Sequence, residues 1–314
     1  MNDAGISDGA QASRVKQILI TGGNGQLGTE LKRYAWPEGW AVTAIDIDEL
    51  DLRDTAAIAA MVASKSWAAV ISAGAYTAVD KAESDIVTAW AVNAMAPAAF
   101  AEACAKAGIP IVQVSTDYVF DGASDGAWDV NDPVAPLGVY GASKLGGELA
   151  VRTSGARHAI VRTAWVVSAH GNNFIKTMLR VGATNPTLRV VDDQHGSPTS
   201  ATDLAAALAT ITMRLVEDPA APTGTYHFSN AGAVTWADFA REIFAQSAAR
   251  GGASAEVQGI TTADYPTPAT RPANSLLSHS AIRAGYGIEP RDWQVALADI
   301  LDELIGPAAA ETHA

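Results

Sequence analysis

Tyr140 and Lys144 are the residues of this sequence whose types and spacing first indicate chemistry. They lie four positions apart at the start of an expected helix, so that both side chains project from one helical face. A nearby ammonium favours the phenolate and lowers the pKa of a tyrosine from its usual value of about 10. Tyr140 is therefore a candidate proton donor near neutral pH. The pair alone is a weak signal, because the same spacing occurs on many solvated helices.

A glycine-rich turn near the N-terminus strengthens this interpretation. The apolar run 17–21 predicts a buried strand, and the loop after it reads Gly22-Gly23-Asn24-Gly25-Gln26-Leu27-Gly28 before a helix begins. Glycines at this spacing permit a tight turn, close approach of the backbone to a pyrophosphate and close packing of the helix on the strand. An ordinary flexible turn is the alternative. The strand and helix on either side favour dinucleotide binding by Gly22, Gly25, Gln26, Leu27 and Gly28.

The next expected strand, 41–45, ends in Asp46, whose carboxylate could bond an adenosine ribose and so favours NAD. The following loop reads Asp51-Leu52-Arg53-Asp54. If this loop folds back over the adenosine, Asp51 and Leu52 line the cofactor site and the Arg53 cation could accommodate a 2′-phosphate. A helix-capping Asp54 beside a solvated Arg53 is the alternative.

Two further strand ends carry candidate site residues. The third expected strand, 68–73, ends in Ala73 and is followed by Gly74 and Ala75, whose small size would let a cofactor lie close. The fourth, 111–115, runs into the polar and aromatic cluster that begins Thr116-Asp117-Tyr118. Ligands of open α/β sheets bind at the carboxyl ends of the strands, so this cluster indicates a site.

The elements that must position these residues form a regular series. A fifth strand is expected at 159–163, and a long helical stretch at 84–107 contains Pro97, which should kink or divide it. Five strands alternating with helical patterns predict an α/β fold, a Rossmann-type doubly wound parallel sheet. We expect a disordered leader at 1–14, a dinucleotide-binding domain at 15–165 completed by about 200–230, and a smaller mixed α/β substrate-binding domain at 166–199 and 231–314.

Composition narrows the class of protein. The chain has 314 residues, nearly half of them apolar, and a formal net charge of −13, which opposes general attraction to nucleic acid or to an anionic membrane. Its single cysteine, Cys104, excludes an internal disulfide and fits a reducing compartment. The N-terminus lacks the features of a signal peptide, and we find no spanning apolar run. We therefore expect a cytoplasmic protein that binds neither nucleic acid nor membrane.

These motifs together resemble an extended short-chain dehydrogenase/reductase, and within that superfamily most closely the dTDP-4-dehydrorhamnose reductase family. The resemblance runs the length of the chain after the leader, through Thr21 to Gly28, Ser115 to Gly122, Tyr140 to Lys144, Arg162 to Val166, Asp193 to Thr199 and Arg271 to Leu276. The glycine motif and the Tyr/Lys pair mark only the superfamily. The variant Gly25-Gln26-Leu27-Gly28 and the run Ser115 to Gly122 are more particular to the family.

The resemblance implies catalytic positions for Thr116, Tyr140 and Lys144, and substrate contacts for Asp117, Tyr118 and Trp165. It implies reduction of the C4 ketone of dTDP-4-dehydro-β-L-rhamnose to dTDP-β-L-rhamnose, with Lys144 and Tyr140 also touching the cofactor. The structural alternatives are that Trp165 belongs to the core, Thr116 caps a turn and Tyr118 packs under the loop. Arg271 could grip the substrate diphosphate, or fix its loop by bonding backbone carbonyls.

The cofactor, the partners and two rival functions complete the expectations. Asp46 favours NADH whereas the resemblance admits NADPH, so we expect NADPH first and NADH as possible. A dTDP-sugar is the expected partner, a homodimer is possible, and no motif predicts a metal site. The alternatives are a reductase or epimerase for another nucleotide sugar, or a regulatory subunit that binds dinucleotide without turnover. Retention of Thr116, Tyr140 and Lys144 together argues against the non-catalytic subunit.

Overall fold

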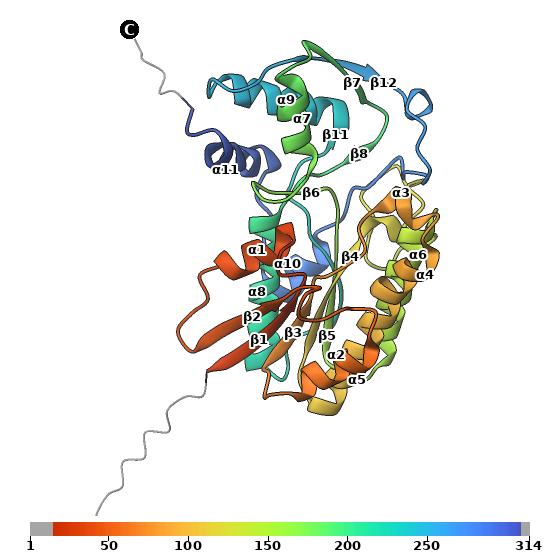
Figure 1. Cartoon of the computed structure of the whole chain (residues 1–314), viewed down its shortest axis with the longest axis vertical. Helices are drawn as coiled ribbons and strands as arrows, with labels where there is room; N and C mark the ends of the chain where they lie inside the picture. The colour runs from red at the N-terminus through yellow and green to blue at the C-terminus, as the bar shows by residue number, and fades with distance from the viewer. Residues whose placement is uncertain (1–14, 309–314) are drawn as a thin grey trace, which may run out of the picture.

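The computed structural model describes residues 15–308, and the expected leader at 1–14 lies outside them. Six strands form the central sheet: β1 (Lys16–Thr21), β2 (Trp40–Ile45), β3 (Ala69–Ser72), β4 (Ile111–Thr116), β5 (His158–Thr163) and β10 (Gly224–His227). Their order across the sheet is β10-β5-β4-β3-β1-β2, and every neighbouring pair is parallel. The chain therefore reverses direction across the sheet between β1 and β3, which makes it doubly wound (Figure 1).

Helices cover both faces of this sheet. One face packs against α1 (Gln26–Arg33), α8 (Ala201–Glu217) and α10 (Ser280–Tyr286), and the other against α2 (Thr55–Ala63), α5 (Ala96–Ala107) and α6 (Val139–Thr153). Alternate residues of β1 divide between the two cores: Ile18 and Ile20 face the first layer, and Leu19 faces the second. Because both faces are covered, the strands are continuous apolar runs, which is why the sequence pattern located them.

The crossover from β3 to β4 contains the predicted interruption. It consists of α3 (Val79–Ala82), α4 (Ile86–Trp90), a π-helical turn η1 (Ala91–Met95) and then α5, with Pro97 in the first turn of α5. Proline cannot donate to the carbonyl four residues earlier, and the π turn accommodates that missing bond. The helical run Ile86–Ala107 is long and apolar enough to cross a membrane by length and composition alone. It instead packs against α2 and α6, and Phe100 and Cys104 are buried beneath the sheet.

The remaining elements gather beyond the carboxyl ends of the strands (Figure 1). They include α7 (Phe174–Gly182), α9 (Trp236–Ala248), α11 (Trp293–Leu304), the 3-10 turn η3 (Thr262–Asp264), and the strands β6 (Val166–Val167), β7 (Thr187–Val191), β8 (His195–Gly196), β9 (Thr199–Ser200), β11 (Val234–Thr235) and β12 (Glu256–Ile260). A separate aromatic core lies among α7, α9 and α11, with Phe239 at its centre. β12 pairs in parallel with β7, although its sequence lacks the apolar alternation that would have predicted a strand.

Candidate active site

A cleft of about 850 Å³ opens at the carboxyl ends of β1 to β5. It is lined by the glycine loop after β1, the segments after β2 and β3, the 3-10 turn η2 (Asp117–Val119) after β4, the start of α6, and the residues after β5. Every residue that the sequence nominated for cofactor or substrate lines this cleft except Arg271. Parallel strands of a doubly wound sheet deliver their loops to one edge, so residues as far apart in sequence as Thr21 and Trp165, 144 positions, meet there.

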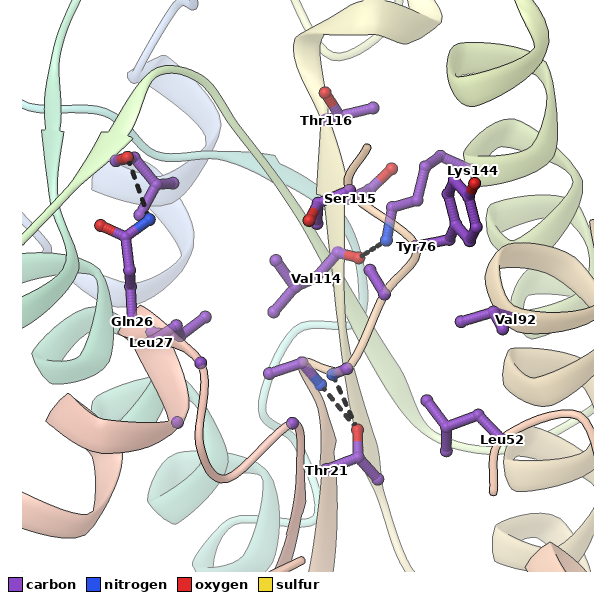
Figure 2. Close-up of a pocket in the computed structure, with 18 of the residues that line it drawn as sticks. Thr21, Gln26, Leu27, Leu52, Tyr76, Val92, Val114, Ser115, Thr116 and Lys144 are labelled. Carbon is purple, nitrogen blue, oxygen red and sulfur yellow. Dashed lines mark hydrogen bonds between the residues drawn. The ribbon is translucent and has the colours of Figure 1, made fainter. Parts of the chain in front are cut away.

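The glycine loop is built for close backbone contact. Gly22 has φ +73°, and a Cβ at that position would lie 2.8 Å from Gly74 Cα. A Cβ on Gly28 would collide with the Gly22 carbonyl oxygen. The Thr21 hydroxyl accepts from the amides of Ala73 and Gly74 at 3.1 and 2.9 Å, which ties the end of β1 to the end of β3 (Figure 2). The segments on either side of the doubly wound junction are thereby fixed to each other.

This loop fits the diphosphate of a dinucleotide. Gly25 is the N-cap of α1 and supplies no side-chain cap, so the first-turn amides of the helix face the cleft without a carboxylate or hydroxyl competing for them. No acidic residue occurs in that turn. Free amides at a helix N-terminus bind anions, and a side chain at Gly22 or Gly28 would displace the backbone that presents these amides.

Gln26 and Leu27 contact protein as well as lining the cleft. The Gln26 side-chain amide donates to the Val166 carbonyl at 3.4 Å (Figure 2). Its oxygen accepts from Asn173 Nδ2 at 3.0 Å. Leu27 packs on the core between the sheet and α8. Gln26 therefore joins the cofactor loop to the segment that follows Trp165, a connection that its position in the glycine motif does not reveal.

At the adenosine end, Asp46 accepts hydrogen bonds from the amides of Asn24 and Ile47 at 2.7 and 2.8 Å. Its carboxylate thus also holds the glycine loop. Arg53 bonds Asp51 through Nε and an NH2 group, and this contact lowers the pKa of Asp51 to about 2. Asp54 caps α2 by accepting from the Ala57 amide. Both alternatives that the sequence left open therefore hold in part. Asp54 caps the helix, and Arg53 lines the cleft but is paired with Asp51.

Thr116, Tyr140 and Lys144 converge in the middle of the cleft. Lys144 reaches from α6 to the sheet, where its ammonium donates to the Val114 carbonyl at 2.6 Å (Figure 2). The Thr116 hydroxyl, at the end of β4, donates to Asp117 Oδ1 at 2.9 Å and also lies beside the Tyr140 phenol. The register of α6 on β4 is thus what brings a phenol, an ammonium and a hydroxyl to one place.

The electrostatics of the pair differ from the expectation. Burial raises the pKa of Tyr140 to about 12, against an opposing effect of the Thr116 hydroxyl, and burial lowers the pKa of Lys144 to about 8. The expectation that Lys144 lowers the pKa of the phenol was therefore wrong for this structure. The cause is geometric, because the ammonium is directed at Val114 rather than at the phenol. At neutral pH both groups carry their protons.

Asp117 and Tyr118 form the wall next to Tyr140. Asp117 is buried, one of its carboxylate oxygens has no hydrogen-bond partner, and burial raises its pKa to about 6. The Tyr118 ring meets the Tyr140 ring edge to face, with centroids 5.4 Å apart, and burial raises the pKa of Tyr118. An α6 glycine, Gly141, permits this contact, since a Cβ there would collide with the Tyr118 carbonyl.

Trp165 lines the cleft in a strained conformation. Its φ of 50° makes it the one non-glycine residue with positive φ in the part of the chain that the structure describes. Its indole stacks on Trp236, with centroids 3.5 Å apart, and a Cβ on Gly196 would lie 2.5 Å from the ring. Backbone strain of this kind is found where neighbouring packing fixes a functional side chain.

Arg271 lies outside the cleft lining. Its guanidinium donates to both carboxylate oxygens of Asp80 at 2.7 and 2.8 Å and to the Ala269 carbonyl at 2.9 Å. The bond to Ala269 is the kind of contact that the loop-fixing alternative predicted. Asp80 belongs to α3, so the pair also joins the loop before Asn274 to the cofactor side of the cleft.

Asn93 and Glu148 lie outside the cleft lining but hold elements that form it, and the sequence pattern assigned no function to either. Asn93, in η1, accepts from the Tyr76 amide and donates to the Tyr76 carbonyl and the Ser143 hydroxyl, so it ties the segment after β3 to α6. Glu148 repeats the spacing of Tyr140 and Lys144 once more along α6, and that spacing is the signal that could have found it.

Fold and cleft together define an NAD(P)-dependent oxidoreductase of the short-chain dehydrogenase/reductase type. The family model described as the RmlD substrate binding domain matches residues 16–305 of the chain. The chain belongs to the dTDP-4-dehydrorhamnose reductase family.

Individual relatives of known name match this chain over nearly its whole length. The dTDP-4-dehydrorhamnose reductase of Sinorhizobium fredii is 41% identical over 279 residues, which cover 88% of this chain and 94% of the relative. A crystal structure of a dTDP-4-dehydrorhamnose reductase from Clostridium acetobutylicum superposes with a TM-score of 0.86 at 38% identity, covering 92% of this chain and 99% of that one. The enzyme from Bacillus anthracis, solved in complex with NADP, has a TM-score of 0.85 at 33% identity over the same shares.

Proposed function

We propose that this chain reduces the C4 ketone of dTDP-4-dehydro-β-L-rhamnose to dTDP-β-L-rhamnose, and that Thr116, Tyr140 and Lys144 carry the chemistry. The observation that supports the assignment of residues most directly is the meeting of a phenol, an ammonium and a hydroxyl in the cleft that the glycine loop borders. A reduced nicotinamide would supply the hydride. Side chains of the cleft would bind and orient the sugar and would protonate its ketone oxygen.

Tyr140 would be the proton donor. Reduction of a ketone develops negative charge on its oxygen, and a phenol within hydrogen-bond reach can protonate that oxygen as the charge forms. With its pKa raised to about 12, Tyr140 carries its proton throughout the neutral range. The Thr116 hydroxyl would hold the same oxygen. Lys144, charged below its pKa of about 8, would hold the nicotinamide ribose.

The nucleotide sugar would lie between the two halves of the molecule. We assign cofactor binding to residues 15–165, with 200–230 completing that domain, and substrate binding mainly to 166–199 and 231–308 of the described chain. Tyr118 and Trp165 offer apolar ring surface to a deoxysugar, and the unpartnered oxygen of Asp117 offers an acceptor for a sugar hydroxyl. Arg271 would reach a substrate diphosphate only if Asp80 released it.

NADPH is the first cofactor to test and NADH the second. The NADP complex of the Bacillus anthracis relative supports NADPH. Asp46 at the end of β2 favours the free 2′-hydroxyl of NADH, and Arg53, which could meet a 2′-phosphate, is paired with Asp51.

The test is turnover by the purified full chain with NADPH or NADH and dTDP-4-dehydrorhamnose made in situ, followed by nicotinamide absorbance and identification of the sugar product. Tyr140→Phe should lower turnover by about 10²- to 10⁴-fold while cofactor affinity is kept, because the ring stays and only the proton is removed. Tyr265→Phe, at an exposed tyrosine outside the cleft lining, is the matched control. No oxidation of either cofactor by the wild-type protein would refute the activity. Unchanged turnover in Tyr140→Phe would remove that residue from the mechanism.

A further inference from the structure

Glu148 is a carboxylate buried completely beneath the proposed active site. It lies on α6 one turn after Lys144 and two turns after Tyr140, so the three side chains share one face of the helix. Its exposed fraction is 0%, and that of Arg162, on β5, is 1%. Neither residue lines the cleft, so substrate contact does not explain them.

Four hydrogen bonds hold the Glu148 carboxylate. Arg162 donates to both oxygens, from Nε at 2.8 Å and from an NH2 group at 2.7 Å. The Ser115 hydroxyl donates at 2.6 Å, and Arg152, which reaches the surface, donates at 2.9 Å. A buried carboxylate with all these donors is fixed in one position, because every alternative would leave a charge without a partner.

The partner of Glu148 is itself fixed. The Arg162 guanidinium lies over the Phe120 ring at 5.0 Å, and a third donor group approaches His227 Nε2 at 3.4 Å. His227 Nδ1 lies 3.1 Å from the Trp128 carbonyl, which only a protonated Nδ1 can bond, so Nε2 is free to accept from Arg162. The guanidinium therefore cannot follow a displaced carboxylate.

These contacts set the register between α6 and β4. Three consecutive residues of β4 each meet a different residue of the α6 face: the Val114 carbonyl meets Lys144, the Ser115 hydroxyl meets Glu148, and Thr116 lies beside Tyr140. Figure 2 shows the first of these contacts, with Ser115 and Thr116 following along the strand. Of the three α6 residues, only Glu148 does not line the cleft, so neither cofactor nor substrate would compete directly for its carboxylate.

We propose that Glu148, held by Arg162 and Ser115, is a positioning residue for the reduction, which keeps Lys144 charged and Tyr140 in line with Thr116. The proposal deepens the proposed function and rests on it. Glu148 would touch neither substrate nor cofactor, and it would act through the ammonium one turn away.

The charges around this face of α6 support the effect on Lys144. The ionisable groups there are Tyr140, Glu148 and Arg152 on the helix, Asp117 and Tyr118 on η2, Arg162 on β5, and Glu83 after α3, which accepts from the Val139 amide. Burial lowers the pKa of Lys144 to about 8, and Glu148 is the neighbour whose charge opposes that shift. Without this carboxylate the pKa of Lys144 would be lower still, and the ammonium would be deprotonated at a lower pH than in the wild-type protein.

The first experiment is the pH dependence of kcat/KM in Glu148→Gln, which keeps the shape of the side chain and removes its charge. We expect a loss of about tenfold to 10²-fold at neutral pH, and an alkaline limb that moves to lower pH by about one unit. Glu102→Gln is the matched control, since Glu102 forms an exposed ion pair on α5. It should leave both the rate and the limb unchanged.

A second variant separates positioning from simple charge balance. Glu148→Gln alone leaves Arg162 buried without a counter-ion and risks a folding defect. The double variant Glu148→Gln with Arg162→Gln removes both charges together, so it restores charge balance in the core. We expect it to recover thermal stability toward wild type and to keep the shifted alkaline limb. Recovery of the wild-type pH profile would show that Glu148 only balances Arg162, and would overturn the proposal.

A measurement independent of turnover keeps this test distinct from that of the proposed function. Biosynthetic labelling with [¹³Cε]lysine gives each lysine an NMR signal, and the Lys144→Arg variant assigns the one that belongs to Lys144. The titration midpoint of that signal should fall by about one pH unit in Glu148→Gln and in the double variant. An unchanged midpoint would overturn the proposal even if the wild-type enzyme reduces the sugar. A shifted midpoint in a protein that reduces no sugar would instead refute the proposed function alone.

Discussion

The indole of Trp165 lies nearly flat on the indole of Trp236, with ring centroids 3.5 Å apart and planes 14° apart. Trp165 follows the last long strand before the chain leaves the sheet, and Trp236 begins α9 in the aromatic core beyond it. Phe174 of α7 packs against Trp236, with ring centroids 4.6 Å apart. The stack therefore braces the strained backbone of Trp165 from the side of the molecule that we assign to substrate.

Trp236→Leu should weaken substrate binding as well as stability. The substitution removes the surface that holds Trp165, so we expect the free energy of unfolding to fall by about 1–3 kcal/mol and KM for the nucleotide sugar to rise. Near-ultraviolet circular dichroism should lose the signal of two coupled indoles. Trp67→Leu is the control, because Trp67 is buried in the core on the α2 side of the sheet. It should lower stability and leave KM unchanged, and an equal rise of KM in both variants would contradict the role of the stack.

Gly28→Ala should abolish cofactor binding. Its Cβ would collide with the Gly22 carbonyl oxygen, and that oxygen is part of rigid backbone held by the Gly25 amide at 3.0 Å. The loop must shift, and the first-turn amides of α1 shift with it. Calorimetric titration with NADPH measures the effect. Gly126→Ala is the control, since nothing lies within 4 Å of a Cβ at that position, and it should bind NADPH as wild type does.

Arg271 and Asp80 should behave as one unit. Their bidentate pair joins α3 to the loop before Asn274, so we expect Arg271→Met and Asp80→Asn to raise KM for the sugar to a similar extent. The double variant should then be little worse than either single one, with a coupling free energy of about 1 kcal/mol in a double-mutant cycle. If Arg271→Met raises KM while Asp80→Asn does not, Arg271 instead contacts the substrate diphosphate directly.

The sequence specified the sheet and the meeting of Thr116, Tyr140 and Lys144 because both depend on local pattern. Buried parallel strands are continuous apolar runs, and their carboxyl ends share one edge of the sheet. The partners of Arg271 and Trp165 could not be predicted in this way, since Asp80 and Trp236 lie 191 and 71 positions away in unrelated patterns. The pKa of Tyr140 was predicted in the wrong direction because spacing along a helix gives proximity, whereas burial and the direction of the Lys144 ammonium decide the shift.

Acid should destabilise the protein through His227, which is fully buried between Arg162 and Trp128. Burial, with the neighbouring Arg162 charge, lowers its pKa from 6.5 to about 3. Between these two values the unfolded chain binds a proton that the folded chain does not, so stability falls as pH falls through this window, by up to about 1.4 kcal/mol per pH unit. Asp117, whose pKa burial raises to about 6, has the opposite effect below that pH and reduces the net loss.

His227→Gln isolates the histidine contribution, because a glutamine can still donate to the Trp128 carbonyl and accept from Arg162 but has no proton to gain. Urea unfolding at about pH 7 and about pH 5 should show a smaller loss of stability in this variant than in wild type. His158→Gln, at a partly exposed histidine on β5, should leave the wild-type loss intact. The assignment of acid sensitivity to His227 fails if His227→Gln loses as much stability between the two pH values as the wild-type protein does.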